Sequence, residues 1–271
     1  MARHLRALGH DVVAVGGRKP FEPGGPAVDV LDLAGLKSFL QSHEDADVIV
    51  NCVGTLVSAS DRDPDLAVYT NAYFPHLLER FGRDSATKII HLSTDCVFEG
   101  TNPPYLETSA YDGQSVYDRS KALGEIRNEK DLTFRMSIVG PDLSPSGVGL
   151  FNWFMQQQGS IRGFTKAIWN GITTVELARG VAAAIEQDLV GLYHLVPDGP
   201  AVSKYELLKL FQVAFDRSDL QIEADDRSAP NKTLVNSRDD FDFQVKPYTE
   251  QLSDMRLWID SDAGNYSHYR M

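Results

Sequence analysis

The feature that most constrains this fold is the alternation of apolar strands with helices along the first half of the chain. Four runs have the length and β-branched content of strands: Val12–Val15, Val48–Cys52, Lys88–Leu92 and Thr133–Val139. A further strand is expected near Val28, and the clearest helix start is Asp63 followed by Pro64. Because strands joined through helices pair in parallel, the pattern predicts an α/β fold with a doubly wound parallel sheet.

Beyond Gly140 the character of the sequence changes. A loop at residues 141–145 leads into a helix rich in aromatic residues around Phe151. Ser203 and Glu206 have the spacing of a capping box before a later helix, whereas a strand at Gly191–Leu195 returns to the sheet. We therefore expect two domains. Residues 1–140 plus 172–196 hold the sheet, and residues 141–171 plus 197–271 form a smaller C-terminal lobe.

The composition narrows the classes of function. The 271 residues carry a formal net charge of −12, with 42% hydrophobic and 24% charged residues. These values are typical of a folded globular protein and unfavourable for binding nucleic acid or an anionic membrane, and no apolar run is long enough to span a bilayer. Cys52 and Cys96 lie in apolar stretches and are expected to be reduced core thiols of a cytoplasmic protein. The histidines show no metal-ligand spacing, His91 is expected to be a core residue, and no metal is predicted.

Two residues of one predicted helix can carry chemistry. Tyr117 and Lys121 are four residues apart, which places both side chains on one face. A ketone that accepts hydride needs a proton on its developing alkoxide, and a nearby ammonium lowers the pKa of a phenol from its ordinary value of about 10. Thr94, at the end of an apolar strand, can hydrogen-bond the same oxygen. The alternatives are a solvated helix face for the pair and a strand-end cap for Thr94 and Asp95.

Longer strings around these residues carry a family resemblance. They are LSTDCVFEG at Leu92–Gly100, YDRSKALGE at Tyr117–Glu125, RMSIVGP at Arg135–Pro141 and GFTKAIW at Gly163–Trp169. Together they resemble the extended short-chain dehydrogenase/reductases, specifically the dTDP-4-dehydrorhamnose reductase family, over nearly the whole chain. The fold that this resemblance implies is a Rossmann-like dinucleotide-binding domain with a substrate-binding lobe.

The resemblance implies NADPH-dependent reduction of a 4-keto-deoxysugar nucleotide, for the biosynthesis of cell-surface polysaccharide sugars. The implied roles are substrate orientation for Thr94, a neighbouring place in the site for Asp95, proton donation for Tyr117, and contact with cofactor and tyrosine for Lys121. A homodimer is expected from the same likeness. Two alternatives stay open: a non-catalytic regulatory subunit resembling that of methionine adenosyltransferase, and a sugar-nucleotide epimerase or dehydratase.

The cofactor side departs from the family pattern. The first strand and the glycine-rich turn are absent, so we expect Met1 to be an internal methionine of a longer protein. Arg18 and Lys19 follow the strand Val12–Val15 where an acid would hold a ribose hydroxyl, which favours NADP(H) over NAD(H). The residues expected to contact the cofactor are Arg18, Asp29, Val30, Cys52, Val53, Gly54, Asn71, Tyr117, Lys121 and Ser137.

The substrate side is expected to combine cationic hydrogen-bond donors for a diphosphate with aromatic walls for a base. The candidates are Thr94, Phe98, Phe164, Lys166, Trp169 and Arg227, with Lys232 and Arg238 in the same region. The alternative for each is a solvated cation or a core aromatic.

Overall fold

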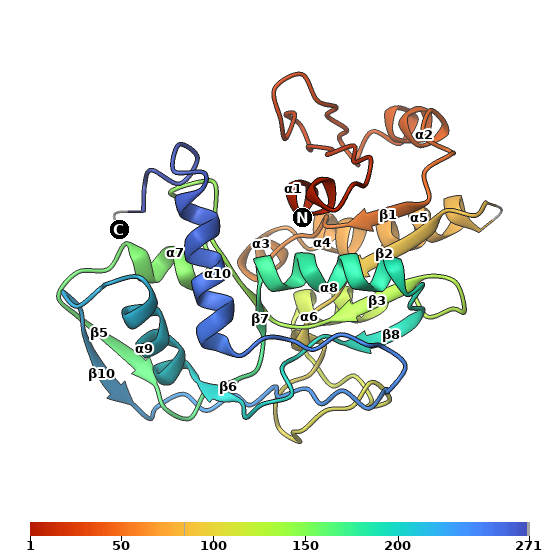
Figure 1. Cartoon of the computed structure of the whole chain (residues 1–271). Helices are drawn as coiled ribbons and strands as arrows, with labels where there is room; N and C mark the ends of the chain where they lie inside the picture. Colours follow the sequence, from red (N-terminus) through yellow and green to blue (C-terminus); the bar gives the residue numbers. More distant parts are fainter. Residues whose placement is uncertain (84, 270–271) are drawn as a thin grey trace. The chain divides into compact units, whose positions relative to one another are not determined.

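The computed structural model describes residues 1–83 and 85–269. The chain divides into two compact units (Figure 1). The first consists of Met1–Val97, Tyr111–Arg135 and Ala184–Tyr193, and the second of Phe98–Ala110, Met136–Ala183 and His194–Met271. Phe98–Ala110 and most of the helix after Thr173 were predicted to belong to the first domain. In the structure they belong to the second unit. The functional division into a cofactor domain and a substrate lobe stays a prediction.

The first unit is built on a four-stranded sheet in the order β1-β2-β3-β8. Its strands are β1 (Val48–Asn51), β2 (Lys88–Leu92), β3 (Leu132–Arg135) and β8 (Gly191–His194). β1, β2 and β3 are parallel, with Val48 opposite Lys88 and Ile90 opposite Leu132. β3 is buried along its whole length, as expected for an inner strand covered on both faces. The predicted α/β class with a parallel sheet is confirmed.

Helices surround these strands in the first unit. They are α1 (Ala2–Ala7), α2 (Leu33–Gln41), α3 (Val57–Arg62), α4 (Pro64–Val68), the π-helix η1 (Tyr69–Tyr73), α5 (Phe74–Gly82), the 3-10 turn η2 (Asp95–Val97) and α6 (Val116–Leu123). Leu36, Phe74 and Leu78 from the helices pack against Ile89 of β2. The predicted start at Pro64 is confirmed. The π-helix η1 lies just before Pro75, a residue that cannot donate a backbone hydrogen bond.

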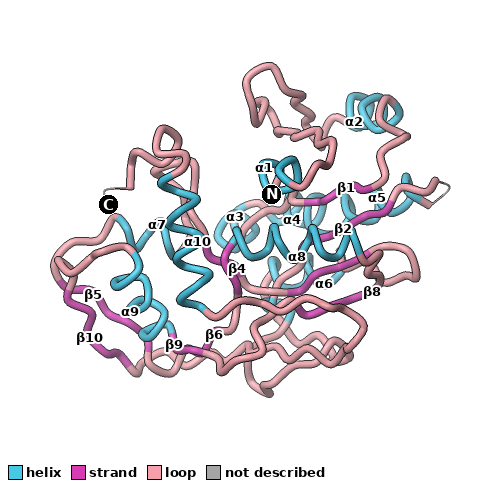
Figure 2. Tube along the Cα trace, in the orientation of Figure 1, coloured by secondary structure: helices cyan, strands magenta, loops and turns pink. Residues whose placement is uncertain are grey.

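The strands expected at Val12–Val15 and near Val28 do not form, and this part of the prediction is wrong. The only pairing among the described residues of this segment is an isolated bridge between Gly16 and Ala27, and Figure 2 draws the segment as loop. Val13 and Val15 are exposed. Alternating apolar residues favour an extended backbone, but a strand forms only where its N–H and C=O groups meet a neighbouring strand.

The second unit contains three two-stranded pairs. They are β5 (Ser160–Phe164) parallel to β10 (Gln221–Asp225), β4 (Ile138–Val139) parallel to β7 (Ile172–Thr173), and β6 (Ile168–Trp169) antiparallel to β9 (Val202–Ser203). Its helices are α7 (Leu150–Met155), α8 (Thr174–Glu186), which continues into the first unit, α9 (Lys204–Ala214) and α10 (Tyr248–Asp260). Phe151, Phe154, Phe211 and Phe215 form its core. The capping box of Ser203 and Glu206 is confirmed.

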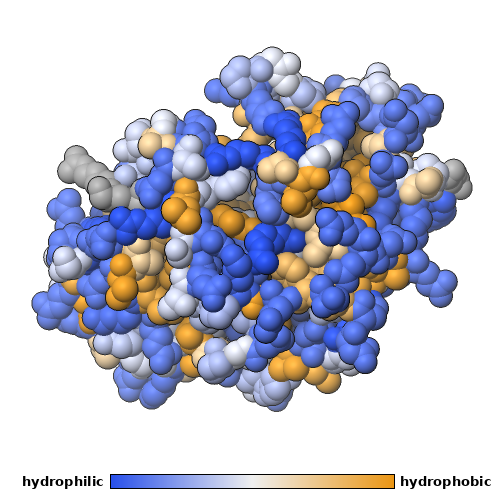
Figure 3. Space-filling model, in the orientation of Figure 1, coloured by the Kyte–Doolittle hydropathy of each residue, from blue (hydrophilic) through white to orange (hydrophobic). Residues whose placement is uncertain are grey.

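Hydrophilic residues cover much of the face shown in Figure 3, interrupted by apolar patches. Within residues 1–83 and 85–269, no helix is both long and apolar enough to cross a bilayer.

Candidate active site

The carboxyl end of β2 carries the first candidate residue. Thr94 follows β2 and is buried, and its hydroxyl lies 3.2 Å from Asp95 Oδ1, to which it donates. The same hydroxyl oxygen accepts from the backbone N–H of Cys96 at 3.1 Å. The Thr94 side chain also acts on Tyr117, whose pKa it lowers in part. Thr94 therefore caps the strand end, as the alternative interpretation required, and lies near the candidate proton donor.

Helix α6 carries both Tyr117 and Lys121. Its start is set by a capping box in which Ser115 and Asp118 each accept from the other's backbone N–H, both at 3.1 Å. Tyr117 lies in the first turn and Lys121 in the last. The helix was expected to extend to Glu129, but it ends at Leu123 with Gly124 as its C-cap.

Lys121 is deeply placed. Its side chain is buried, and its Nζ donates to the carbonyl of Leu92 at 2.6 Å and lies 3.4 Å from His91 Nε2. Burial lowers the pKa of Lys121 to about 8, although the negative charge of Glu125 acts in the opposite direction. The amine is therefore close to its own pKa at neutral pH, as an exposed lysine would not be.

Tyr117 behaves differently from the sequence-based expectation. Burial raises its pKa well above 10, Cys96 and Asp95 raise it further, and the Thr94 side chain lowers it in part. Lys121 is not among the main influences on this pKa, and its amino group donates to the Leu92 carbonyl. Tyr117 is thus a protonated phenol at neutral pH, which is the form that a proton donor needs.

Directly behind this pair lies a buried cluster that sequence reasoning missed. The carboxylate of Glu125 accepts from Ser93 Oγ at 2.7 Å, Tyr111 Oη at 2.6 Å, and Arg135 Nε and a terminal nitrogen at 2.9 and 2.7 Å. The side chains of Glu125 and Arg135 are 0% exposed. The cluster joins the ends of β2 and β3 to the chain around α6. A charged residue inside the apolar run of β3 was the signal that could have revealed it.

Asn71 holds the loop after β1 against α6. Its Oδ1 accepts from the backbone N–H of Thr55 at 2.8 Å, and its Nδ2 donates to the Thr55 carbonyl at 3.0 Å and to Ser120 Oγ at 3.2 Å. Asn71 is fully buried in the π-helix η1. These bonds steady the loop that follows β1, and the contact of Asn71 with a cofactor stays a prediction.

We expect Gly124→Ala to be strongly destabilising. A Cβ at Gly124 would lie 1.8 Å from the backbone oxygen of Asn71, so α6 and η1 must separate to make room. Overpacking of this kind costs about 1–3 kcal/mol of unfolding free energy. Urea unfolding would measure the loss. Gly199→Ala is the matched control, since its Cβ would meet nothing within 4 Å, and equal losses in the two variants would contradict the steric explanation.

The remaining cofactor candidates are divided between the units. Cys52, Val53 and Gly54 follow the end of β1 and are exposed, so the expectation of a core thiol is wrong for Cys52. The Arg18 side chain is 79% exposed and pairs with Asp29 at 3.2 Å. The Val30 carbonyl accepts from Tyr69 Oη at 2.6 Å. Ser137 lies in the second unit, where its hydroxyl accepts from Trp169 Nε1 at 2.8 Å.

The substrate candidates beyond Thr94 all belong to the second unit. Phe98 is 0% exposed and stacks on Tyr105, and Trp169 is 4% exposed, so both pack in the core. Phe164 is exposed, Lys166 pairs with Asp226 at 3.2 Å, and Arg227 pairs with Asp225 at 2.6 Å. The last two cations are largely exposed, so they are accessible from solvent. Their role in binding substrate stays a prediction.

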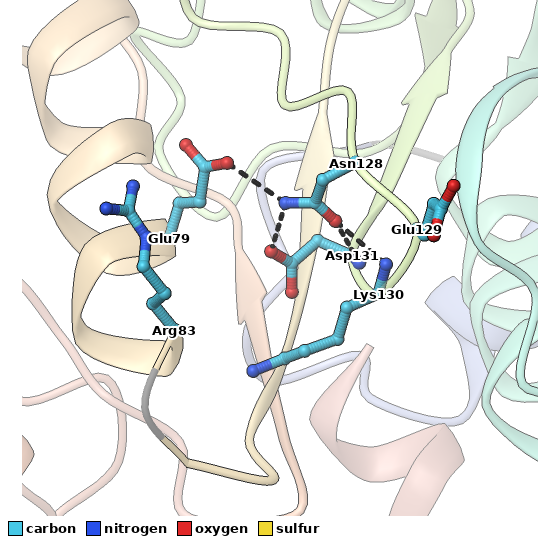
Figure 4. A pocket seen from close by; sticks show the side chains of 6 residues that line it. All are labelled: Glu79, Arg83, Asn128, Glu129, Lys130 and Asp131. Atoms are coloured by element: carbon cyan, nitrogen blue, oxygen red, sulfur yellow. Dashed lines mark hydrogen bonds between the residues drawn. The ribbon is translucent and has the colours of Figure 1, made fainter.

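A cavity of about 330 Å³ lies elsewhere in the first unit, at the end of α5 and the turn before β3 (Figure 4). It is lined by Glu79, Arg83, Asn128, Glu129, Lys130 and Asp131. Asn128 Nδ2 donates to Glu79 at 2.9 Å and to Asp131 at 2.8 Å. Asp131 precedes β3, whereas Thr94 follows the parallel strand β2. The cavity is therefore at the amino end of the strands, opposite the candidate site.

A comparison with known protein families shows which family this chain belongs to. The family described as RmlD substrate binding domain matches residues 1–238. The chain belongs to this family. The family resemblance noted in the sequence is thereby confirmed.

Individual relatives in curated collections carry reductase names. The chain is 29% identical over 230 residues to a dTDP-4-dehydrorhamnose reductase of Sinorhizobium fredii, covering 76% of this chain and 77% of the relative. It is 28% identical over 165 residues to the enzyme of the same name from Salmonella typhimurium, and this match spans about half of that enzyme, 55% of its length. A match of 31% over 106 residues is to methionine adenosyltransferase 2 subunit beta of Xenopus tropicalis, covering 36% of this chain and 29% of that protein.

Solved structures share the fold of this RmlD-family chain. A dTDP-4-dehydrorhamnose reductase from Clostridium acetobutylicum superposes with a TM-score of 0.73 at 21% identity, covering 86% of this chain and 90% of the other. One from Bacillus anthracis in complex with NADP has a TM-score of 0.73 at 20% identity, covering 85% and 87%. A UDP-glucose 4-epimerase from Thermotoga maritima reaches 0.76 at 16% identity, covering 97% and 96%. At these identities the likeness establishes the fold.

Proposed function

We propose that this chain catalyses the NADPH-dependent reduction of a 4-keto-deoxysugar nucleotide, in the biosynthesis of polysaccharide sugars. The observation that carries the proposal is the placement of Tyr117 and Lys121 one turn apart on α6, with Lys121 Nζ donating to the Leu92 carbonyl at the carboxyl end of β2. Ligands of open α/β sheets bind at this end of the strands. The reductase names of the Sinorhizobium and Salmonella relatives support the same activity.

The first unit offers surfaces that fit a nicotinamide dinucleotide. Val53 and Gly54 are exposed just after β1, and the exposed guanidinium of Arg18 is available to a 2′-phosphate. These residues, with Asp29, Val30, Cys52 and Asn71, would hold the cofactor, and Lys121 would contact its ribose. NADPH, when bound, supplies the hydride. The structure of the Bacillus anthracis relative in complex with NADP supports this choice of cofactor.

The residues of this chain then handle the proton and the orientation of the ketone. Thr94 is proposed to hold the carbonyl oxygen by a hydrogen bond, for which its hydroxyl turns its one proton from Asp95 Oδ1 to that oxygen. As negative charge develops on the oxygen, Tyr117 transfers its phenolic proton to it, and the product is the alcohol. Asp95 accepts the Thr94 proton when no substrate is bound. Lys166 and Arg227 are proposed to contact the diphosphate of the substrate, with the exposed Phe164 as an aromatic wall.

The direct test is to follow NADPH oxidation by the purified protein with dTDP-4-dehydrorhamnose. The expected result is one NADPH consumed for each keto-sugar reduced. Product formation without net NADPH consumption would instead identify an epimerase or dehydratase. Absence of turnover together with stable binding to the catalytic subunit of a methionine adenosyltransferase would favour the second candidate, a regulatory subunit, which the Xenopus relative supports.

A homodimer is also proposed, to be tested by light scattering.

We expect Arg18→Ala to weaken the preference for NADPH over NADH. The side chain is an exposed cation paired with Asp29, and a charge-assisted hydrogen bond to a phosphate is worth about 1.5–3 kcal/mol, or roughly 10- to 100-fold in relative KM. The KM values for both cofactors measure the effect. Arg3→Ala is the matched control, because Arg3 is also an exposed arginine of the first unit. A rise in both KM values by the same factor would contradict a role in reading the 2′-phosphate.

A further inference from the structure

The end of β2 is tied to the chain around α6 by hydrogen bonds from two successive residues. The carbonyl of Leu92 accepts from Lys121 Nζ at 2.6 Å. The hydroxyl of Ser93 donates to Glu125 Oε1 at 2.7 Å. Ser93 is 7% exposed, and its backbone N–H donates to the Phe134 carbonyl of β3 at 2.7 Å. Ser93 is therefore held through its backbone by the sheet and through its side chain by Glu125.

The Glu125 carboxylate is a fixed acceptor for this hydroxyl. Arg135 Nε donates to Oε1 at 2.9 Å and Arg135 Nη2 donates to Oε2 at 2.7 Å, so one planar guanidinium holds both oxygens. The next residue, Ile126, is bound to Thr133 of β3. Thr133 Oγ1 accepts from the Ile126 N–H at 3.1 Å and donates to the Ile126 carbonyl at 2.8 Å. Because Glu125 and Ile126 are both bound to β3, the sheet sets the position of the oxygen that Ser93 meets.

Thr94 depends on this attachment, because the bonds of its own side chain are local. Its hydroxyl donates to Asp95 Oδ1 at 3.2 Å and accepts from the Cys96 N–H at 3.1 Å. Both partners belong to the turn that Thr94 begins, so these bonds shape the turn without fixing its distance from α6. The bonds of Leu92 and Ser93, the two residues before Thr94, do connect it to the chain around α6.

We propose that Ser93 is a positioning residue of the reductase site, which holds Thr94 where Thr94 and Tyr117 can meet the same substrate oxygen. The inference rests on the proposed reduction for its catalytic meaning. Ser93 acts through Thr94, since its own hydroxyl is directed to the buried carboxylate of Glu125. A displacement of about 1 Å in a group that orients the substrate can lower the rate about 10²-fold, so one buried hydrogen bond can have a large effect on turnover.

The variants Ser93→Ala and Tyr111→Phe test this role as a matched pair. Each removes one hydroxyl that donates to Glu125, at 2.7 Å from Ser93 and at 2.6 Å from Tyr111, but only Ser93 adjoins Thr94. The two bonds from Arg135 keep the carboxylate in place in both variants. Urea unfolding midpoints are expected to fall by similar amounts, because each variant loses one hydrogen bond to the same carboxylate. A difference in turnover would then not be explained by stability.

Ser93→Ala is expected to lower kcat for ketone reduction by about 10- to 100-fold, with the KM for NADPH within about twofold of the wild-type value. Tyr111→Phe is expected to leave kcat and this KM within about twofold of wild type. Initial rates at varied NADPH and keto-sugar concentrations measure these constants. Equal losses of kcat in the two variants, or a change confined to KM, overturn the proposal.

A second measurement needs neither cofactor nor keto-sugar. The ¹³C-labelled methyl group of Thr94 is observed by NMR in the wild type and in both variants without ligands. In Ser93→Ala its order parameter is expected to fall and its chemical shift to move, and in Tyr111→Phe both are expected to stay at the wild-type values. An unchanged Thr94 methyl group in Ser93→Ala overturns the proposal. If the wild type reduces no keto-sugar, the reductase function fails, and this measurement still decides whether Ser93 positions Thr94.

Discussion

Replacing Tyr117 by phenylalanine is expected to lower kcat for ketone reduction by about 10²- to 10⁴-fold, the range typical of a lost general acid. The substitution removes the phenolic proton and leaves the aromatic ring in the first turn of α6. Burial holds the pKa of this phenol well above 10, so the group is protonated throughout the neutral range and its loss is not replaced by another acid at the same atom. Initial rates of NADPH oxidation measure the effect.

Two controls make this result specific. Tyr73→Phe changes an exposed tyrosine of η1 and is expected to leave kcat within about twofold of wild type. NADPH binding by Tyr117→Phe, followed by fluorescence, should remain measurable, because the phenol is proposed to act on the substrate oxygen. If Tyr117→Phe turned over at the wild-type rate, Tyr117 would not be the proton donor and the proposed mechanism would be wrong.

Arg135→Met is expected to be the most destabilising single change described here, costing about 3–5 kcal/mol of unfolding free energy. It leaves the Glu125 carboxylate buried, with Ser93 and Tyr111 as its remaining close donors and the partly exposed Arg127 at 3.4 Å. An uncompensated buried charge is far more costly than the intact pair. Urea unfolding followed by circular dichroism would measure the change. The double variant Glu125→Leu with Arg135→Met should recover part of the loss, since it removes both charges.

The loss of stability in Arg135→Met is also expected to depend on pH. Burial raises the pKa of Glu125, but the bonds and charge of Arg135, with Tyr111 and Ser93, lower it below its ordinary value overall. A lowered folded-state pKa contributes stability above the unfolded-state pKa, and this contribution is lost as the pH falls through the folded value. Without Arg135 burial dominates and the carboxyl group favours its protonated form. The deficit of Arg135→Met should therefore shrink as the pH is lowered, and a deficit independent of pH would contradict this explanation. Arg127→Met removes a guanidinium whose side chain is 45% exposed and lies 3.4 Å from the Glu125 carboxylate, and it is expected to cost less than about 1 kcal/mol.

The positions of Asn51, His91 and Lys121 show how far sequence reasoning reached into the site. The spacing of Tyr117 and Lys121 predicted that they share a helix face, and α6 has them in its first and last turns. The expected lowering of the phenol's pKa by the lysine was wrong, because burial dominates and raises the pKa of Tyr117. His91 was expected to be an ordinary core residue, and its bond to Asn51 depends on the register of two strands that are far apart in the chain.

The sequence by itself determined the features that depend on residues a few positions apart. The alternation of strands and helices specified the parallel α/β fold, Pro64 and the capping box of Ser203 and Glu206 specified the starts of α4 and α9, and the strings around Thr94 and Tyr117 specified the family. Only the tertiary structure decided that Val12–Val15 lacks a strand partner, that Gly124 ends α6 against Asn71, and that Glu125 meets Arg135. The physical reason is range. Propensity and capping act within one or two turns of the chain, whereas pairing, burial and pKa are set by atoms a few ångströms away that belong to distant segments.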